Sequence, residues 1–197
     1  MKTKHSRIAV AFLVLTISVA AAAQATGQGE TAADNKKRPD VIFVPTQQTV
    51  VEAMLDLAKV NENDVLYDLG CGDGRIVVTA AQKYGARAVG IDIDPERIRE
   101  SNENARKAGV TSKVEFRQAD LFKSDFSEAS VVTLYLLSTL NEKLHPILMK
   151  QLKPGTRIVS HDFPMGDWKP EKTITVDAED RQHTVHLWVV PQRSAKK

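Results

Sequence analysis

Three glycines at alternate positions, flanked by carboxylates, form the stretch of this sequence best suited to chemistry. The segment reads Tyr-Asp-Leu-Gly-Cys-Gly-Asp-Gly-Arg over residues 67–75 and follows a short apolar run. Glycine is needed where a ligand approaches the backbone closely or where φ is positive, and a helix that begins near residue 75 presents free N–H groups. The order of strand, glycine turn and helix predicts a nucleotide-type binding site at the carboxyl end of a parallel sheet.

Acidic residues in and around the turn restrict the ligand. A dinucleotide fold uses the spacing G-x-G-x-x-G and holds a pyrophosphate at the helix N-terminus. Here the spacing is G-x-G-x-G, at Gly70, Gly72 and Gly74. Asp68 precedes the turn and Asp73 lies inside it, and both carboxylates would repel a pyrophosphate. They favour a ligand that carries an ammonium group and ribose hydroxyls, such as S-adenosylmethionine.

The next predicted strand adds a further acid. Asp92 ends that strand, 24 positions after Asp68, where an acid accepts hydrogen bonds from a ribose diol in the related dinucleotide fold. Asp94 falls on the other face by strand periodicity, and we expect it to cap the helix that Pro95 opens. Asp92 is therefore the predicted ribose ligand.

Apolar periodicity along the chain predicts alternating strands and helices. Strands are expected at 65–69, 88–92, 114–118, 130–136 and 156–161, and helices at 75–84, 95–108 and 139–152. A helix from the N-cap Thr46 to about Lys59 precedes them, and a hairpin at 173–176 and 184–189 follows them. The fold class is α/β: a Rossmann-like sheet of seven strands, mostly parallel, with a C-terminal antiparallel hairpin and helices on both faces.

The N-terminus has the three-part form of a secretory signal peptide. Lys2, Lys4 and Arg7 precede an apolar run that ends in small residues, so residues 1–25 are predicted to be a signal peptide or an N-terminal membrane anchor. The protein is expected to be exported, to the periplasm or the extracellular space, if this leader is cleaved, and membrane-anchored if it is not. Residues 26–39 are predicted to be a flexible linker, 40–192 one domain and 193–197 a basic tail.

Composition argues against nucleic acid as a partner. Of the 27 basic residues three belong to the leader, and the remaining 24 face 25 acidic residues. No basic footprint for nucleic acid remains. The single cysteine, Cys71, excludes an intrachain disulfide, and the sequence shows no cluster of metal ligands, so no metal is expected.

Four ordered segments carry a resemblance to a known family. They are 44–55, the glycine turn at 67–77, Val-Thr-Leu-Tyr-Leu-Leu at 132–137 and Gly-Thr-Arg-Ile-Val-Ser-His-Asp-Phe at 155–163. Over roughly residues 44–190 the chain resembles class I S-adenosylmethionine-dependent methyltransferases. Within them it is most similar to the lysine methyltransferase group that includes the enzyme modifying the c subunit of ATP synthase, and more loosely to Dot1-type lysine methyltransferases.

The resemblance assigns roles to the cofactor site. It implies that Asp68 holds the methionine ammonium and that the three glycines let the backbone pass under the cofactor. Asp92 would accept from the ribose hydroxyls, and Asp120 from the adenine amino group. Leu121 or Phe122 would lie against the adenine ring.

The acceptor side is less well defined, because the sulfonium carries an activated methyl group and the enzyme mainly aligns a nucleophile with it. A lysine must also lose a proton, which a desolvating pocket or a nearby acceptor promotes. The candidates follow the fourth and fifth strands: Tyr135, Ser138, Asn141, His161 and Asp162. Tyr135 could equally be a core aromatic and Ser138 a helix N-cap, whereas the lone histidines His145, His183 and His186 are expected at the surface or in the hairpin.

Three functions follow from this pattern. The first is a protein-lysine N-methyltransferase, acting as a monomer, with a small membrane protein as a plausible acceptor. The second is a small-molecule methyltransferase, which would need a lid from residues 40–59 or 163–172. The third is a cofactor-binding module without activity. The Asn-Pro-Pro-Tyr motif typical of enzymes that act on bases or amides is absent after residue 135, which argues against those acceptors.

Overall fold

The computed structural model describes residues 42–193. The predicted leader, the linker and all of the basic tail except Arg193 lie outside the described residues. Within the described part of the chain, no helix is long and apolar enough to cross a membrane.

One seven-stranded sheet organises the described residues, as predicted. Its strands are β1 (Val65–Leu69), β2 (Arg87–Asp92), β3 (Val114–Gln118), β4 (Val131–Leu134), β5 (Arg157–His161), β6 (Lys172–Asp177) and β7 (Gln182–Val189). Their order is β3-β2-β1-β4-β5-β7-β6, with β1 to β5 parallel and the β6–β7 hairpin antiparallel. The chain order reverses between β1 and β4, and ligands of open α/β sheets bind at such a point.

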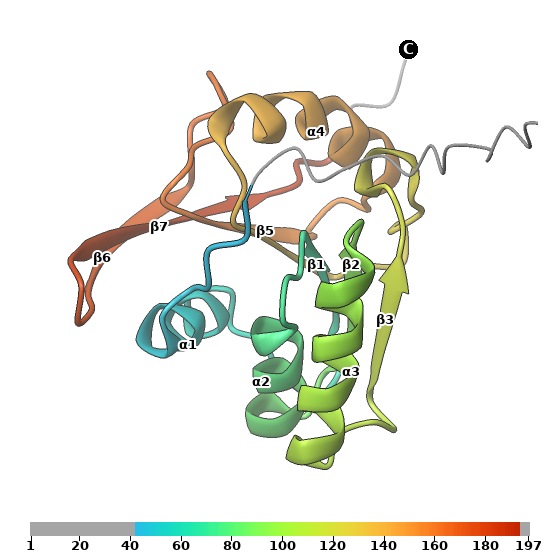
Figure 1. The fold of residues 1–197 in the computed structure, drawn as a ribbon. Coiled ribbons are helices and arrows are strands. Elements are labelled where there is room, and N and C mark those ends of the chain that lie inside the picture. The colour runs from blue at the N-terminus through green and yellow to red at the C-terminus, as the bar shows by residue number, and fades with distance from the viewer. Residues whose placement is uncertain (1–41, 194–197) are drawn as a thin grey trace, which may run out of the picture. The chain divides into compact units, whose positions relative to one another are not determined.

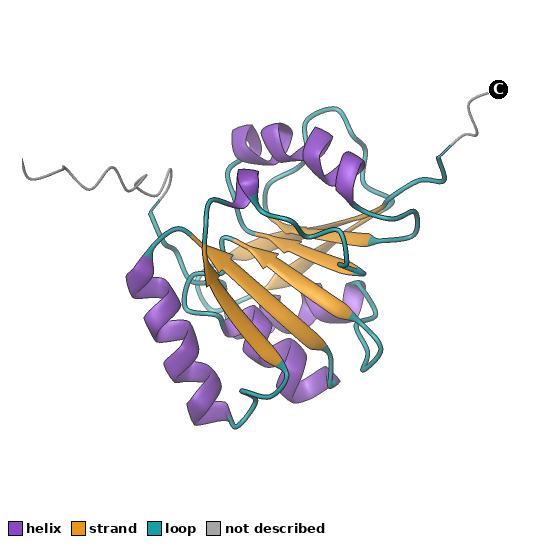
Figure 2. Ribbon diagram, turned by 90° about the vertical axis from the view of Figure 1, so that its right-hand side faces the viewer, coloured by secondary structure: helices purple, strands orange, loops and turns teal. Residues whose placement is uncertain are grey.

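Helices cover both faces of the sheet (Figures 1 and 2). One face carries α1 (Gln48–Leu57), α2 (Arg75–Tyr84) and α3 (Pro95–Ala108), and the other carries α4 (Ser138–Gln151) and the short 3-10 helix η1 (Leu121–Lys123). Neighbouring residues of β1 show the division, since Leu66 packs in the core beneath α1 and α2 whereas Tyr67 packs in the core beneath α4. The alternation follows from the two-residue period of a strand.

Three local predictions were wrong at element ends. Helix α1 begins at Gln48 with Gln47 as its N-cap, and the Thr46 hydroxyl contacts Nδ1 of His161 at 3.2 Å instead of capping the helix. Strand β4 ends at Leu134, so Tyr135 does not lie in the core of a strand. Ser138 is the first residue of α4 rather than its N-cap, which is Leu137. A tertiary contact engages the Thr46 hydroxyl, and β4 ends where its pairing with β1 and β5 ends.

A buried carboxylate fastens the amino ends of three parallel strands. Asp64, 5% exposed, accepts from the backbone N–H of Asn61 at 2.9 Å and from the Ser130 hydroxyl at 2.7 Å, and it pairs with the guanidinium of Arg157. Arg157 also donates to the carbonyl of Ala58 at 2.6 Å, just after α1. These contacts hold β1, β4 and β5 in register at the edge opposite the glycine turn.

We predict that Asp64→Ala lowers the free energy of unfolding by about 3 kcal/mol, because the partly buried Arg157 guanidinium loses its carboxylate and the Ser130 hydroxyl loses its shortest acceptor. Urea denaturation measures the change. Glu62→Ala, an exposed neighbour in the same loop, is the control and should shift stability by less than about 0.5 kcal/mol. Equal effects of the two substitutions would contradict the role given to Asp64.

Candidate active site

The glycine turn has the positive φ angles that its sequence predicts. Gly70, Gly72 and Gly74 have φ values of 85°, 53° and 77°, in the region that favours glycine. The N–H groups of Gly70 and Cys71 donate to the carbonyl of Ile91 at 2.8 and 3.0 Å. Gly72 N–H donates to Oδ2 of Asp92 at 2.9 Å. The turn is therefore held by hydrogen bonds to the end of β2.

A cleft opens at the carboxyl ends of β1, β2 and β4. Its empty volume, including the part open to solvent, is about 970 Å³. Of the seven predicted cofactor residues, five line the cleft: Asp68, Gly70, Asp92, Asp120 and Leu121. Gly72 and Gly74 complete the turn beneath it.

Asp68 is the most perturbed acid of the cleft. It is 2% exposed, and its Oδ1 accepts from the Thr133 hydroxyl at 2.8 Å. Burial raises the pKa of Asp68 to about 7, and the neighbouring carboxylates Asp92 and Asp73 act in the same direction. A cationic group of a ligand would lower the pKa of Asp68 and favour its charged form, so the site is suited to an ammonium group.

The other acids of the cleft also support its backbone. Oδ1 of Asp92 accepts from Asp94 N–H at 2.9 Å, and burial raises the pKa of Asp92. Asp94 caps α3 by accepting from Glu96 N–H at 2.8 Å, as predicted, although it lines the cleft as well. Asp120 caps η1 through Phe122 N–H at 3.0 Å. Each acid is thus oriented before a ligand binds.

Of the five acceptor-side candidates, only Tyr135 is part of the cleft wall. Its ring stacks on the His161 ring with 3.8 Å between centroids, so His161 supports it from behind. Asn141 is fully buried and donates to the Ser160 hydroxyl at 3.2 Å and to the carbonyl of Phe163 at 3.0 Å, which gives it a structural position. Asp162 lies beyond His161.

A segment that precedes α1 closes one side of the cleft. Ile42, Phe43, Val44 and Thr46 line it, and Phe43 lies so close to Gly72 that a Cβ there would come within 2.1 Å of the aromatic ring. The Arg97 guanidinium lies over the Phe43 ring at 5.0 Å. Sequence reasoning identified this region only as possible lid material, because an aromatic near a turn has no periodic signal.

A cluster of polar side chains lies next to Tyr135, on the side where its ring stacks on His161. His161, Asp162 and His183 place one ligand atom each within reach of a common ion, a grouping that the sequence did not reveal. His183 belongs to the hairpin as expected, but it is 3% exposed rather than at the surface. His161 and His183 are 22 positions apart in the chain and meet only because β5 pairs with β7.

Comparisons with known proteins agree with the geometry of the cleft. Residues 68–172 match the family model described as the ANTKMT methyltransferase domain. A protein-lysine N-methyltransferase of Saccharolobus islandicus is 49% identical over 77% of this chain and 95% of that protein. A mouse lysine N-methyltransferase named for the c subunit of ATP synthase is 34% identical over 66% of this chain, which spans about half of that relative's length.

A solved structure gives the same class. A protein of Salinibacter ruber, titled an RNA methyltransferase in complex with S-adenosyl-L-homocysteine, is 56% identical with a TM-score of 0.72 and covers 78% of this chain and 98% of its own. The fold and the acidic glycine turn therefore define a class I S-adenosylmethionine-dependent methyltransferase. The chain belongs to the ANTKMT methyltransferase domain family, which confirms the resemblance seen in the sequence.

We predict that Asp92→Asn weakens S-adenosylmethionine binding at least tenfold, because an amide accepts the ribose hydroxyls less well than a carboxylate. Calorimetric titration measures the dissociation constant. Asp94→Asn is the control: asparagine caps a helix about as well as aspartate, so the backbone stays in place and affinity should remain within about twofold. A larger loss in Asp94→Asn than in Asp92→Asn would reverse the ribose assignment.

We also predict a pH dependence of cofactor affinity. Below its pKa of about 7, Asp68 is largely protonated in the free protein and must release a proton to hold the methionine ammonium. The dissociation constant should therefore be about tenfold higher at pH 6 than at pH 8. Asp68→Asn should bind weakly with a flatter profile, whereas a wild-type affinity that is constant between these pH values would remove Asp68 from this role.

Proposed function

We propose that the protein transfers methyl groups from S-adenosylmethionine to lysine amines of a protein. The observation that carries this proposal is the likeness to the Saccharolobus islandicus protein-lysine N-methyltransferase along 95% of that protein. The relatives named for the c subunit of ATP synthase and for adenine nucleotide translocase point to the same acceptor group. An inactive module is disfavoured because the acids and glycines of the cofactor site are all present.

The cleft supplies what this reaction requires. S-adenosylmethionine, when bound, provides a sulfonium whose methyl group is already activated. Asp92 would hold the ribose and Asp68 the ammonium, and together they would orient the cofactor. Tyr135 would then flank the incoming amine at the end of β4. Its apolar neighbours Leu136 and Leu140 desolvate the amine and depress its pKa, so that the neutral nucleophile forms.

The entrance to the cleft supports a protein acceptor with an apolar surface. Ile42 and Val44, which line the cleft, are 86% and 50% exposed, and Leu137, which follows the cleft residue Leu136, is 47% exposed. Large apolar side chains exposed together are typical of interaction sites. A small membrane protein, rather than a freely diffusing metabolite, is the acceptor that we favour.

RNA is a specific alternative because the Salinibacter ruber structure is titled an RNA methyltransferase. The cleft argues against it here. Five carboxylates line the opening, Asp68, Asp73, Asp92, Asp94 and Asp120, and only Arg75 and Arg97 offset them. Arg75 is already paired with Asp73 at 2.6 Å. An acidic rim of this kind repels a phosphate backbone.

We further propose that residues 1–25 bring the domain to a membrane, as a cleaved export signal or as a retained anchor. The support is the sequence of the leader alone. Cell fractionation followed by N-terminal sequencing distinguishes the two fates, and a full-length protein found only in the soluble cytoplasmic fraction would contradict both.

The proposal is tested by incubating the purified protein with methyl-labelled S-adenosylmethionine and three acceptor pools: detergent-solubilised membrane proteins, total RNA and a small-metabolite extract. Label should enter the protein pool, and tandem mass spectrometry should place it on lysine. Label confined to RNA or to the metabolites would overturn the proposal in favour of the corresponding alternative.

We predict that Tyr135→Ala lowers kcat at least tenfold while the dissociation constant of S-adenosylmethionine stays within about threefold, because Tyr135 faces the acceptor. Labelled-methyl transfer and calorimetry measure the two quantities. Thr139→Ala is the control, because Thr139 is an exposed residue in the first turn of α4, and it should leave kcat unchanged. Unchanged kcat in Tyr135→Ala would move the acceptor to another part of the cleft.

A further inference from the structure

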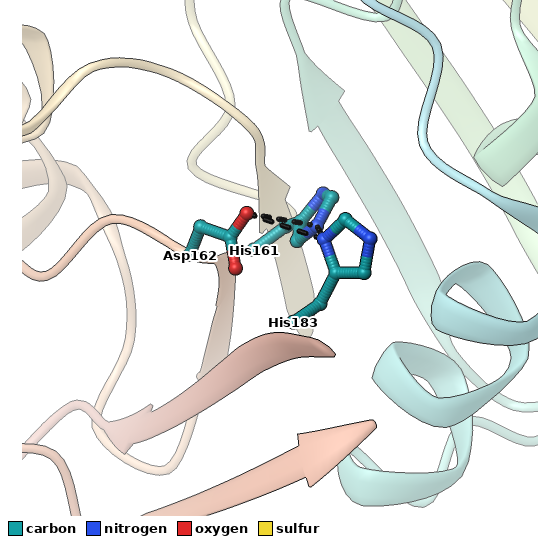
Figure 3. A group of neighbouring side chains, drawn as sticks. All are labelled: His161, Asp162 and His183. Carbon is teal, nitrogen blue, oxygen red and sulfur yellow. Dashed lines mark hydrogen bonds and ion pairs between the residues drawn. The ribbon is translucent and has the colours of Figure 1, made fainter. Parts of the chain in front are cut away.

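The group formed by His161, Asp162 and His183 is not part of the cleft lining. His161 is the last residue of β5, Asp162 follows it, and His183 lies on the antiparallel neighbour β7. Figure 3 shows the three side chains converging from these two strands. The two imidazoles are 1% and 3% exposed, so this is a built interior site rather than a surface cluster.

Two of the three distances among the converging atoms match the spacing of metal ligands, and the third is shorter. Nε2 of His161 lies 2.8 Å from Nδ1 of His183, and each nitrogen lies 3.3 Å from Oδ2 of Asp162. Zinc at about 2.0–2.1 Å from each ligand in tetrahedral geometry separates its ligands by about 3.3 Å. The circle through the three atoms has a radius of about 1.8 Å, so one ion can reach all three at that bond length from just above their plane.

The outer contacts are those that orient metal-binding histidines. Nδ1 of His161 contacts the Thr46 hydroxyl at 3.2 Å, and Nε2 of His183 contacts Oδ1 of Asp180 at 3.0 Å. Each imidazole thus has its second nitrogen in contact with an oxygen atom, which orients the ring. Oδ1 of Asp162 accepts from Thr184 N–H at 2.9 Å, leaving Oδ2 toward the histidines.

The charges around the group also suit a cation. Asp162 and Asp180 contribute two carboxylates, whereas Arg181 is the cation that pairs with Asp162 Oδ2, at 2.5 Å. Arg181 is 52% exposed and can withdraw toward solvent or keep one lone pair of the carboxylate. The neighbouring Tyr135 is neutral and stacks on His161.

We propose that His161, Asp162 and His183 form a binding site for a divalent transition-metal ion of the zinc type, with solvent as the fourth ligand. The ion would fasten the end of β5 to the β6–β7 hairpin. Because His161 also supports the ring of Tyr135, the site would stiffen the acceptor wall of the cleft without taking part in methyl transfer.

The test uses the full chain, produced without a histidine tag, stripped with a chelator and titrated with Co²⁺ and Zn²⁺. We expect one Co²⁺ per chain with the intense visible absorption of a four-coordinate site, and displacement of this ion by Zn²⁺. Zinc should also raise the melting temperature by about 5 °C or more when it is well above its dissociation constant.

Variants assign the ligands without any activity assay, so the result is independent of the proposed acceptor. His183→Ala and Asp162→Asn should each weaken Co²⁺ binding at least a hundredfold. His186→Ala is the control, because His186 lies on the same strand and contacts Thr173 instead. No stoichiometric metal in the wild type, or binding retained in His183→Ala and lost in His186→Ala, would overturn the proposal and leave a hydrogen-bonded network.

Discussion

The site depends on the hydrogen bonds that tie the glycine turn to the end of β2. Two backbone N–H groups of the turn share the Ile91 carbonyl, and a third reaches Asp92, so the end of β1 is fixed against the end of β2. This geometry requires positive φ at three alternate residues, which only glycine provides without strain. The backbone of the turn at Gly70 and Cys71 forms part of the cleft wall.

Burial of acids above this turn gives the cleft its selectivity. Asp68 and Asp92 are both partly deprived of water, and burial raises the pKa of each. An anionic ligand would add to that cost, whereas an ammonium group near Asp68 and hydroxyl donors of a ribose diol near Asp92 would offset it. The same acids disfavour a pyrophosphate, which separates this cleft from a dinucleotide site of related topology.

The fold was largely predictable because its elements carry strong local signals. Strand β1 and helices α2 and α3 were predicted at their observed bounds, and the hairpin was recognised from two short apolar runs. The acids that line the cleft were predicted from their places along the chain, since Asp68 and Asp92 lie near the ends of β1 and β2 and Asp120 follows β3. By contrast, the packing of Phe43 on Gly72, the contact of Thr46 with His161 and the burial of His183 depend on pairing between distant segments. Such contacts produce no periodic pattern in a single sequence, so they could not be predicted from it.

The acceptor wall illustrates the same limit. Tyr135, Asn141, His161 and Asp162 all follow strands at the correct edge of the sheet, yet only Tyr135 reaches the cleft. Asn141 instead ties the loop after β5 to α4. Position along the chain determined which edge each residue occupies, and side-chain packing determined which of them faces the ligand.

A crystal structure of the protein with S-adenosyl-L-homocysteine would test the account most directly. The account predicts that the ribose diol lies within hydrogen-bonding distance of Asp92, that the ammonium lies toward Asp68 and that the sulfur faces Tyr135. A ligand whose ribose is held by Asp94, or whose sulfur points away from Tyr135, would contradict it.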